Sequence, residues 1–180
     1  MHRICGAAAA GPSLALLAVA SLLAACTPSL NWRDVPLADT GLVALLPCKP
    51  DKGERTVPLG GREVTMKMAG CEASGALFAL ASATLPDAAQ AGAVLVQWQA
   101  ATAANMKAQA PAAAPFVPPG AAALPEAVLV SARGVRADGS AVESRAAYFS
   151  AGARVYQAVI YADRLDPAAA ETFFSSLKFR

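Results

Sequence analysis

Cysteine and histidine are the side chains of this sequence best suited to nucleophilic, redox or metal chemistry, and both are scarce. The chain of 180 residues has four cysteines, Cys5, Cys26, Cys48 and Cys71, and one histidine, His2. No two cysteines form a Cys-x-x-Cys motif, the usual pattern of a redox pair or of half a zinc site. What these five residues can do therefore depends on which of them stay in the mature protein.

The N-terminal segment has the organisation of a secretory signal. Arg3 is its only full charge, and an apolar stretch of 12 residues, 14–25, then ends at Cys26. A membrane-spanning helix needs about 20 apolar residues, and Gly11-Pro12 interrupts the alanine-rich approach to this stretch. We therefore expect a signal peptide over residues 1–25 rather than a permanent transmembrane anchor.

The end of this stretch, Leu23-Ala24-Ala25-Cys26, resembles the lipobox of bacterial lipoproteins. The resemblance implies a diacylglycerol on the Cys26 sulfur, cleavage before Cys26 and acylation of the new N-terminus, and several acyl chains suffice for stable membrane attachment. Thr27, rather than aspartate, follows the cysteine, which resembles the default signal for sorting to the outer membrane of Gram-negative bacteria. An ordinary secretory signal that ends in Ala-Ala-Cys is the alternative.

Cleavage would leave a mature chain without histidine. That excludes a Ser-His-Asp triad, a Cys-His pair and histidine-ligated zinc or copper. Cys48 and Cys71 remain beside Cys26. In an oxidising envelope compartment we expect the two to form a disulfide rather than a redox or metal site, because no further soft ligand accompanies them.

Charge and glycine patterns exclude other classes of function. The 15 Lys+Arg and 13 Asp+Glu give a net charge of +2, which is not the basic footprint of a nucleic-acid-binding protein. No glycine-rich phosphate-binding motif is present, and the acidic residues do not cluster as a calcium site. We expect no nucleic acid, no nucleotide, no cofactor, no metal and no catalytic residue.

The lipobox resemblance implies a lipidated N-terminus and tether over residues 26–40, and hydrophobic periodicity predicts a single α+β domain over 41–180. A hairpin around Gly60-Gly61 and a second antiparallel group with a turn at Asp138-Gly139 are expected. The expected strands are 42–46, 55–59, 64–68, 76–83, 127–135, 142–149 and 155–161.

Two helices are expected to cover this sheet. One spans residues 87–107, with a capping box at Asp87 and Gln90. Its apolar stripe includes Trp98 and Met106, for which core packing is favoured over a ligand groove. The other begins at Asp166-Pro167 and runs to residue 178.

Residues 108–125, rich in proline and alanine, separate the two halves of the domain. Five prolines and the absence of charge predict a mobile loop that forms neither helix nor sheet. Phe116-Val117 within it either docks a partner or pins the loop to the domain, and pinning is favoured.

One set of polar residues is a candidate pocket. Pairing the second strand group through its turns places these residues on one sheet face, beside apolar positions, and convergent polar groups in apolar surroundings are typical of binding pockets. Rim salt bridges are the favoured alternative. The polar set is Glu143, Arg145, Arg154 and Tyr156, and the apolar set is Val128, Val130 and Ile160.

The order of elements over residues 41–180 resembles the PsbP/Mog1-like domains of bacterial envelope proteins. The resemblance rests on Leu-Val-Ala-Leu-Leu-Pro, the hairpin at Leu-Gly-Gly-Arg, Ala-Leu-Phe-Ala-Leu-Ala, Val-Tyr-Gln-Ala-Val-Ile and the terminal Phe-Phe-Ser-Ser-Leu-Lys-Phe. It implies an α/β/α sandwich with a central antiparallel sheet. It transfers no function, because one fold serves many functions.

These observations favour a non-enzymatic lipoprotein, anchored by its N-terminal lipid to the outer membrane and facing the periplasm, that binds another envelope protein. A carrier of a small apolar ligand is the alternative. An enzyme that uses Glu143 and Tyr156 is the least favoured class, because it would need burial to raise the pKa of the Glu143 carboxyl group.

Overall fold

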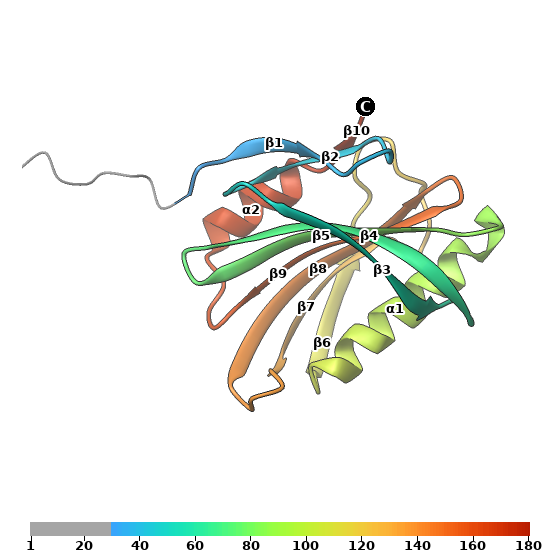
Figure 1. Cartoon of the computed structure of the whole chain (residues 1–180). Coiled ribbons are helices and arrows are strands. Elements are labelled where there is room, and N and C mark those ends of the chain that lie inside the picture. Colours follow the sequence, from blue (N-terminus) through green and yellow to red (C-terminus); the bar gives the residue numbers. More distant parts are fainter. Residues whose placement is uncertain (1–29) are drawn as a thin grey trace, which may run out of the picture.

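The structure, a computed structural model, describes residues 30–180. The predicted signal peptide, the lipobox and Cys26 lie outside the described residues. Residues 30–180 form two antiparallel sheets and two α-helices, an α+β arrangement in which strands predominate (Figure 1).

The larger sheet has seven strands in the order β3-β4-β5-β9-β8-β7-β6, each antiparallel to its neighbours. The predicted hairpin at Gly60-Gly61 joins β3 to β4, and the predicted strand group forms β7, β8 and β9. Pairing of β5 with β9 unites the two halves of the domain. The strands are β3 (Asp51–Leu59), β4 (Arg62–Ala73), β5 (Ala76–Thr84), β6 (Gln109–Pro115), β7 (Val128–Val135), β8 (Ala141–Ala151) and β9 (Arg154–Ala162).

The smaller sheet consists of β1 (Arg33–Pro36), β2 (Leu42–Leu46) and β10 (Lys178–Phe179), in the order β1-β2-β10. Its strands show that two predicted boundaries, the end of the tether and the end of the last helix, are wrong. The tether predicted over 26–40 already contains β1, because the buried Val35 anchors a strand that pairs with β2. The last helix does not reach residue 178, because β10 leaves it to pair with the free edge of β2.

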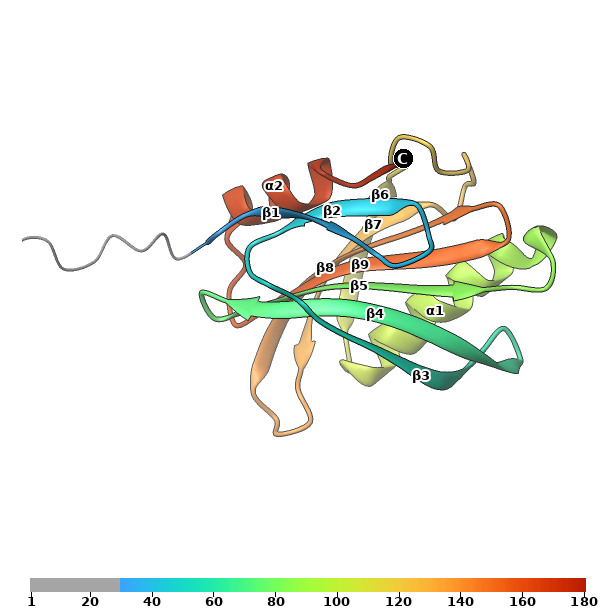
Figure 2. The ribbon, with the colours of Figure 1, turned by 45° about the horizontal axis from the view of Figure 1, so that its top comes forward.

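The two helices pack on opposite faces of the larger sheet (Figure 2). A short 3-10 helix, Ala88–Gln90, precedes α1 (Ala91–Asn105), and Asp87 caps it as predicted. Asp166 caps α2 (Pro167–Ser175), with Pro167 in the first turn. On one face α1 packs alone, whereas on the other α2 shares the cover with the smaller sheet.

The prediction that residues 108–125 form no regular structure is wrong for its first part. Residues 109–115 are β6, the outermost strand of the larger sheet beside β7. An edge strand leaves half of its N–H groups unpaired, so proline is tolerated there, and the register shifts between Gln109 and Ala112, around Pro111. After β6, Phe116 packs on the Phe174 ring of α2, which is the predicted pinning contact.

Candidate functional site

The site best suited to binding is a groove of about 560 Å³ between the C-terminal half of α1 and the larger sheet. A volume of this size is typical of small-molecule sites. Apolar and polar side chains share its lining, and we call it the α1 groove. Its lining includes Glu72, Leu77, Trp98, Thr102, Asn105, Met106, Val135, Arg136, Val142, Gln157 and Tyr161.

The position of α1 follows from its apolar stripe and from one close backbone contact. Trp98 and Met106 are each 7% exposed, so the stripe packs on the sheet as predicted, yet both side chains also line the groove. At the end of the helix the Met106 carbonyl accepts a hydrogen bond from the Val135 N–H. A Cβ atom on Gly134 would collide with that carbonyl oxygen, so glycine permits the helix end to lie on β7.

A hydrogen-bond network fixes the inner wall of the groove. The amide nitrogen of Gln157 donates to the Tyr148 hydroxyl at 3.0 Å and to Thr102 Oγ1 at 3.2 Å. Thr102 Oγ1 in turn donates to the Trp98 carbonyl at 3.0 Å. Burial raises the pKa of the Tyr148 hydroxyl, so it stays protonated. This network ties the helix to β8 and β9 at the point where the groove begins.

Tyr161 contributes one of the polar groups of the groove that remain available, beside the exposed Glu72 and Asn105. Among residues 30–180, none forms a hydrogen bond with its hydroxyl. Burial, with the neighbouring Tyr148 as a lesser cause, raises the pKa of Tyr161 to about 12. The hydroxyl therefore remains a neutral donor at physiological pH, suited to an uncharged or weakly polar acceptor.

Charged residues stand only at the ends of the α1 groove. Glu72 lies at the end of β4, and Arg136 lies in the turn after β7. The Arg136 guanidinium is engaged by Asp163 at 2.7 Å and by the Ala141 carbonyl at 2.8 Å. Glu72 forms no ion pair within residues 30–180, so the charge that the groove offers to a ligand lies at its β4 end.

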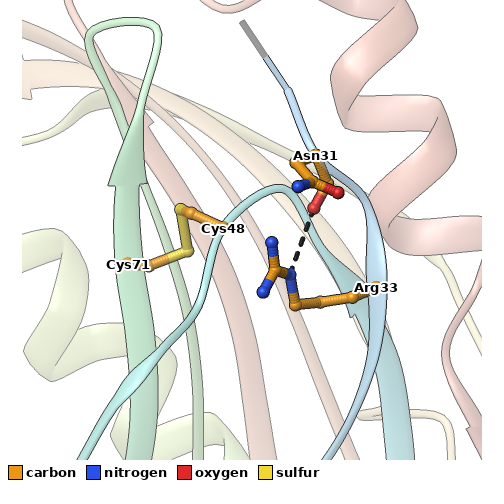
Figure 3. Close-up of a disulfide and its surroundings, with 4 residues drawn as sticks. All are labelled: Asn31, Arg33, Cys48 and Cys71. Carbon is orange, nitrogen blue, oxygen red and sulfur yellow. Dashed lines mark hydrogen bonds between the residues drawn. A yellow bond between two sulfur atoms is a disulfide. The ribbon is translucent and has the colours of Figure 1, made fainter. Parts of the chain in front are cut away.

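The predicted disulfide between Cys48 and Cys71 is present (Figure 3). Cys48 follows β2 and Cys71 lies near the end of β4, so the bridge joins the smaller sheet to the larger one. It lies on the face opposite the α1 groove, in the core that contains α2.

The four residues of the predicted pocket share one sheet face, as expected, but they do not converge. In the register of β8 and β9, Glu143 and Arg154 lie near opposite ends, because Arg154 pairs with Ala151. Eight residues of strand separate Glu143 from Ala151, which is about 26 Å. Val128 and Val130 lie on the opposite face, since β7 pairs them with Tyr148 and Ala146. The register of β7 could not be fixed from sequence.

Each of the four has its own environment. Glu143 accepts from the Leu165 N–H at 3.0 Å and from Arg133 at 3.1 Å, and these contacts lower the pKa of its carboxyl group. The raised pKa that an acid catalyst would need is therefore not found.

Two of the four hold the turn between β1 and β2. Arg154 donates to Thr84 Oγ1 at 3.1 Å and to the Asp39 carbonyl at 2.6 Å. The Tyr156 hydroxyl donates to the Thr40 carbonyl at 3.0 Å. Burial raises the pKa of Tyr156, and its hydroxyl stays protonated in this contact. Both side chains thus stabilise the packing of the smaller sheet.

Leu77, Gln157 and Tyr161 are groove residues that the sequence pattern does not predict. Tyr161 and Gln157 alternate along β9 with Ile160 and Ala158, which belong to the other face. The signal in the sequence is that Gln157 and Tyr161 are polar residues in the otherwise apolar strand β9. This signal locates a groove only when it is known which part of the sheet face α1 leaves uncovered.

Residues 30–180 contain no group of three or more His, Cys, Asp or Glu side chains placed to hold a metal ion. Over the same residues, no helix combines the length and the apolar character needed to cross a membrane. No protein-family model matches this chain, and no curated protein matches it significantly.

Proposed function

We propose that this protein is a lipid-anchored binding protein of the outer membrane, facing the periplasm, and that a small, largely apolar molecule occupies its α1 groove. The groove is the observation that carries the proposal. Apolar side chains such as Leu77, Trp98 and Met106 line it together with several polar groups, among them the neutral Tyr161 hydroxyl. A cleft of this size in which polar groups converge among apolar side chains is typical of a ligand site.

The proposed attachment to the outer membrane rests on the lipobox-like sequence that ends at Cys26. Metabolic labelling with a fatty-acid analogue should mark the wild-type protein and not Cys26→Ala. Cys5→Ala is the matched control, because it also removes a cysteine of the N-terminal region but leaves the lipobox intact. Label that persists in Cys26→Ala would contradict lipidation at this residue.

We also propose the finer fold assignment, an α/β/α sandwich of the PsbP/Mog1-like type. A helix on each face of a central antiparallel sheet supports it. The smaller sheet, which shares one face with α2, is an addition to that pattern.

The proposal includes no enzymatic activity. Glu143 and Tyr156, the residues of the least favoured class, are each held by backbone contacts in different parts of the face. A hydrolase screen of the detergent-extracted protein should find no turnover. Turnover abolished by Glu143→Gln would contradict the binding role.

Binding of an envelope protein is a second candidate, favoured by the edge of the larger sheet. Strand β3 is exposed along its first six residues and has no neighbour on its outer side. An exposed edge can pair with an extended segment of another chain. The α1 groove reaches β4, the neighbour of β3, through Glu72, so such a partner would bind beside the groove rather than in it.

Native mass spectrometry of the protein extracted from membranes in nonionic detergent separates the two candidates. Wild type should carry a bound non-protein mass, and Leu77→Trp, which fills the groove, should lose it. Val96→Trp is the control, because Val96 is 53% exposed on α1 and does not line the groove. Absence of bound mass in the wild type would contradict the ligand proposal. A protein partner retained by Leu77→Trp would then favour the β3 edge.

A further inference from the structure

Arg145 occupies an unusual position on the face of the larger sheet opposite the α1 groove. It lies in the middle of β8, paired with Ser131 of β7 and with Ile160 of β9. Its side chain is half-buried, and it points toward α2, where its guanidinium carbon lies 5.5 Å from the centre of the Phe174 ring. This cation–π contact fixes the plane of the charged group near the helix.

The ring that holds Arg145 is itself fixed. Phe174 is 4% exposed and contacts the Phe173 ring at 5.0 Å and the Phe116 ring at 6.2 Å. The guanidinium therefore rests on a rigid support rather than moving freely in solvent. A side chain held in this way loses little conformational entropy when it binds a ligand.

No acidic group of residues 30–180 lies within 4.0 Å of the Arg145 guanidinium, and its Nε atom is buried without a hydrogen-bond partner. Glu143 lies two residues away on the same face of β8, and its two oxygens accept from Arg133 and from the Leu165 N–H. By contrast, the half-buried Arg154 donates to two protein oxygens.

A buried donor without an acceptor is unfavourable, and proteins usually satisfy it. The planar guanidinium has a fork of N–H groups that matches the two oxygens of a carboxylate or of a phosphate. Ser131, opposite Arg145 on β7, is exposed and can supply a hydroxyl donor to the same anion. Exposed alanines of β6, Ala112 and Ala114, leave the neighbouring surface open.

We infer that Arg145 binds an oxyanion, a carboxylate or a phosphate group, with Ser131 as a second donor. The site lies on the opposite face of the sheet from the α1 groove and does not depend on the proposed function. Phe174 acts as a positioning residue, because it touches the arginine rather than the anion.

The test follows the arginine Nε–Hε resonances of the detergent-extracted protein by NMR during titration with sodium phosphate, sodium acetate or sodium chloride at equal ionic strength. One resonance, absent from Arg145→Lys, should shift and saturate with phosphate or acetate and not with chloride. The anion that saturates the shift at the lower concentration shows whether the site prefers a phosphate or a carboxylate group.

Affinities measured by calorimetry give the quantitative outcome. Arg145→Lys keeps the charge but loses the fork, and it should bind the preferred anion at least tenfold more weakly. Arg55→Lys, on the exposed strand β3, should bind within twofold of wild type. Ser131→Ala, at an exposed position, should weaken binding twofold to fivefold and provides the test if Arg145→Lys does not fold. Equal response to chloride, or unchanged affinity in Ser131→Ala and Arg145→Lys, would overturn the inference.

Discussion

The two faces of the seven-stranded sheet are covered in different ways. The face that bears α2 is closed by the smaller sheet, the helix and a chain of aromatic contacts, Trp32 to Phe78 to Phe173 to Phe174. The other face has a single helix and one ring pair among the described residues, Trp98 with Tyr148. Because one helix cannot cover a seven-stranded sheet, this face keeps the open groove.

The comparison shows that most of the aromatic core lies on one face and the α1 groove on the other, with the inferred Arg145 site on the α2 face beside β7. Alternate residues of β8 and β9 serve the two faces, so neighbours in sequence have different roles. Tyr156 holds the smaller sheet, whereas Gln157 forms the wall of the α1 groove. Substitutions on the closed face should therefore affect stability most, and those on the open face should change the groove at small cost.

The largest effect is expected at Phe173, a fully buried residue of α2. Phe173→Ala leaves a cavity between Phe78 and Phe174 and should lower the free energy of unfolding by about 3–5 kcal/mol. Urea denaturation measures the change, and Glu171→Ala, on the exposed side of α2, is the control. A loss below about 1 kcal/mol would show that α2 does not close this face.

Removal of the disulfide should be the next largest effect. Cys48 and Cys71 are 23 positions apart, and a loop of this length predicts a loss of about 3 kcal/mol in the double variant Cys48→Ser, Cys71→Ser. In wild type, reductant should lower the free energy of unfolding by the same amount as the double substitution does. In the double variant, reductant should leave the free energy of unfolding unchanged. Thiol counting on the unreduced, denatured protein should find neither cysteine reactive. Two reactive thiols would contradict the bridge.

Gly134→Ala tests the close contact that sets the end of α1. The new methyl group meets the Met106 carbonyl and must displace the helix, which should cost about 1–3 kcal/mol and change the shape of the groove. Gly53→Ala is the matched control, because no atom lies within 4 Å of its added Cβ. Trp98 fluorescence should shift in the first variant only. Equal stability of the two variants would mean that Met106 does not contact β7.

The smallest effect at neutral pH is expected for Tyr161→Phe, within about 0.5 kcal/mol, because the hydroxyl has no protein partner to lose. The difference should appear in alkali. The pKa of Tyr161 is about 12 in the folded protein and about 10 in the unfolded chain, so the unfolded state loses its proton first. Wild type should therefore lose stability relative to Tyr161→Phe as pH rises from 10 through 12. Parallel pH profiles would contradict a buried Tyr161.

Local sequence signals predicted the elements with strong periodicity or clear caps. Asp166 caps α2 as predicted, and the hairpins at Gly60-Gly61 and Asp138-Gly139 are present. Asp87 caps the short 3-10 helix before α1, but the Gln90 side chain does not complete the predicted capping box. Strand β6 was missed because its residues, Gln-Ala-Pro-Ala-Ala-Ala-Pro, have neither alternation nor β propensity. Pairing with β7 forms this strand, and that interaction is not encoded within the segment.

The disulfide partners and the polar character of the candidate residues could be predicted from the sequence alone. Cys48 and Cys71 are the pair that the sequence predicts and the structure joins, and the side chains of Arg145 and Tyr161 carry their chemistry wherever they lie. Only the tertiary structure decided which face each residue occupies, because the register of a strand depends on its neighbours. Glu143 and Arg154 were separated in this way, and Tyr161 came to lie under α1. The uncovered part of a face arises from how a helix crosses it, which depends on contacts distant in sequence such as that between Met106 and Val135.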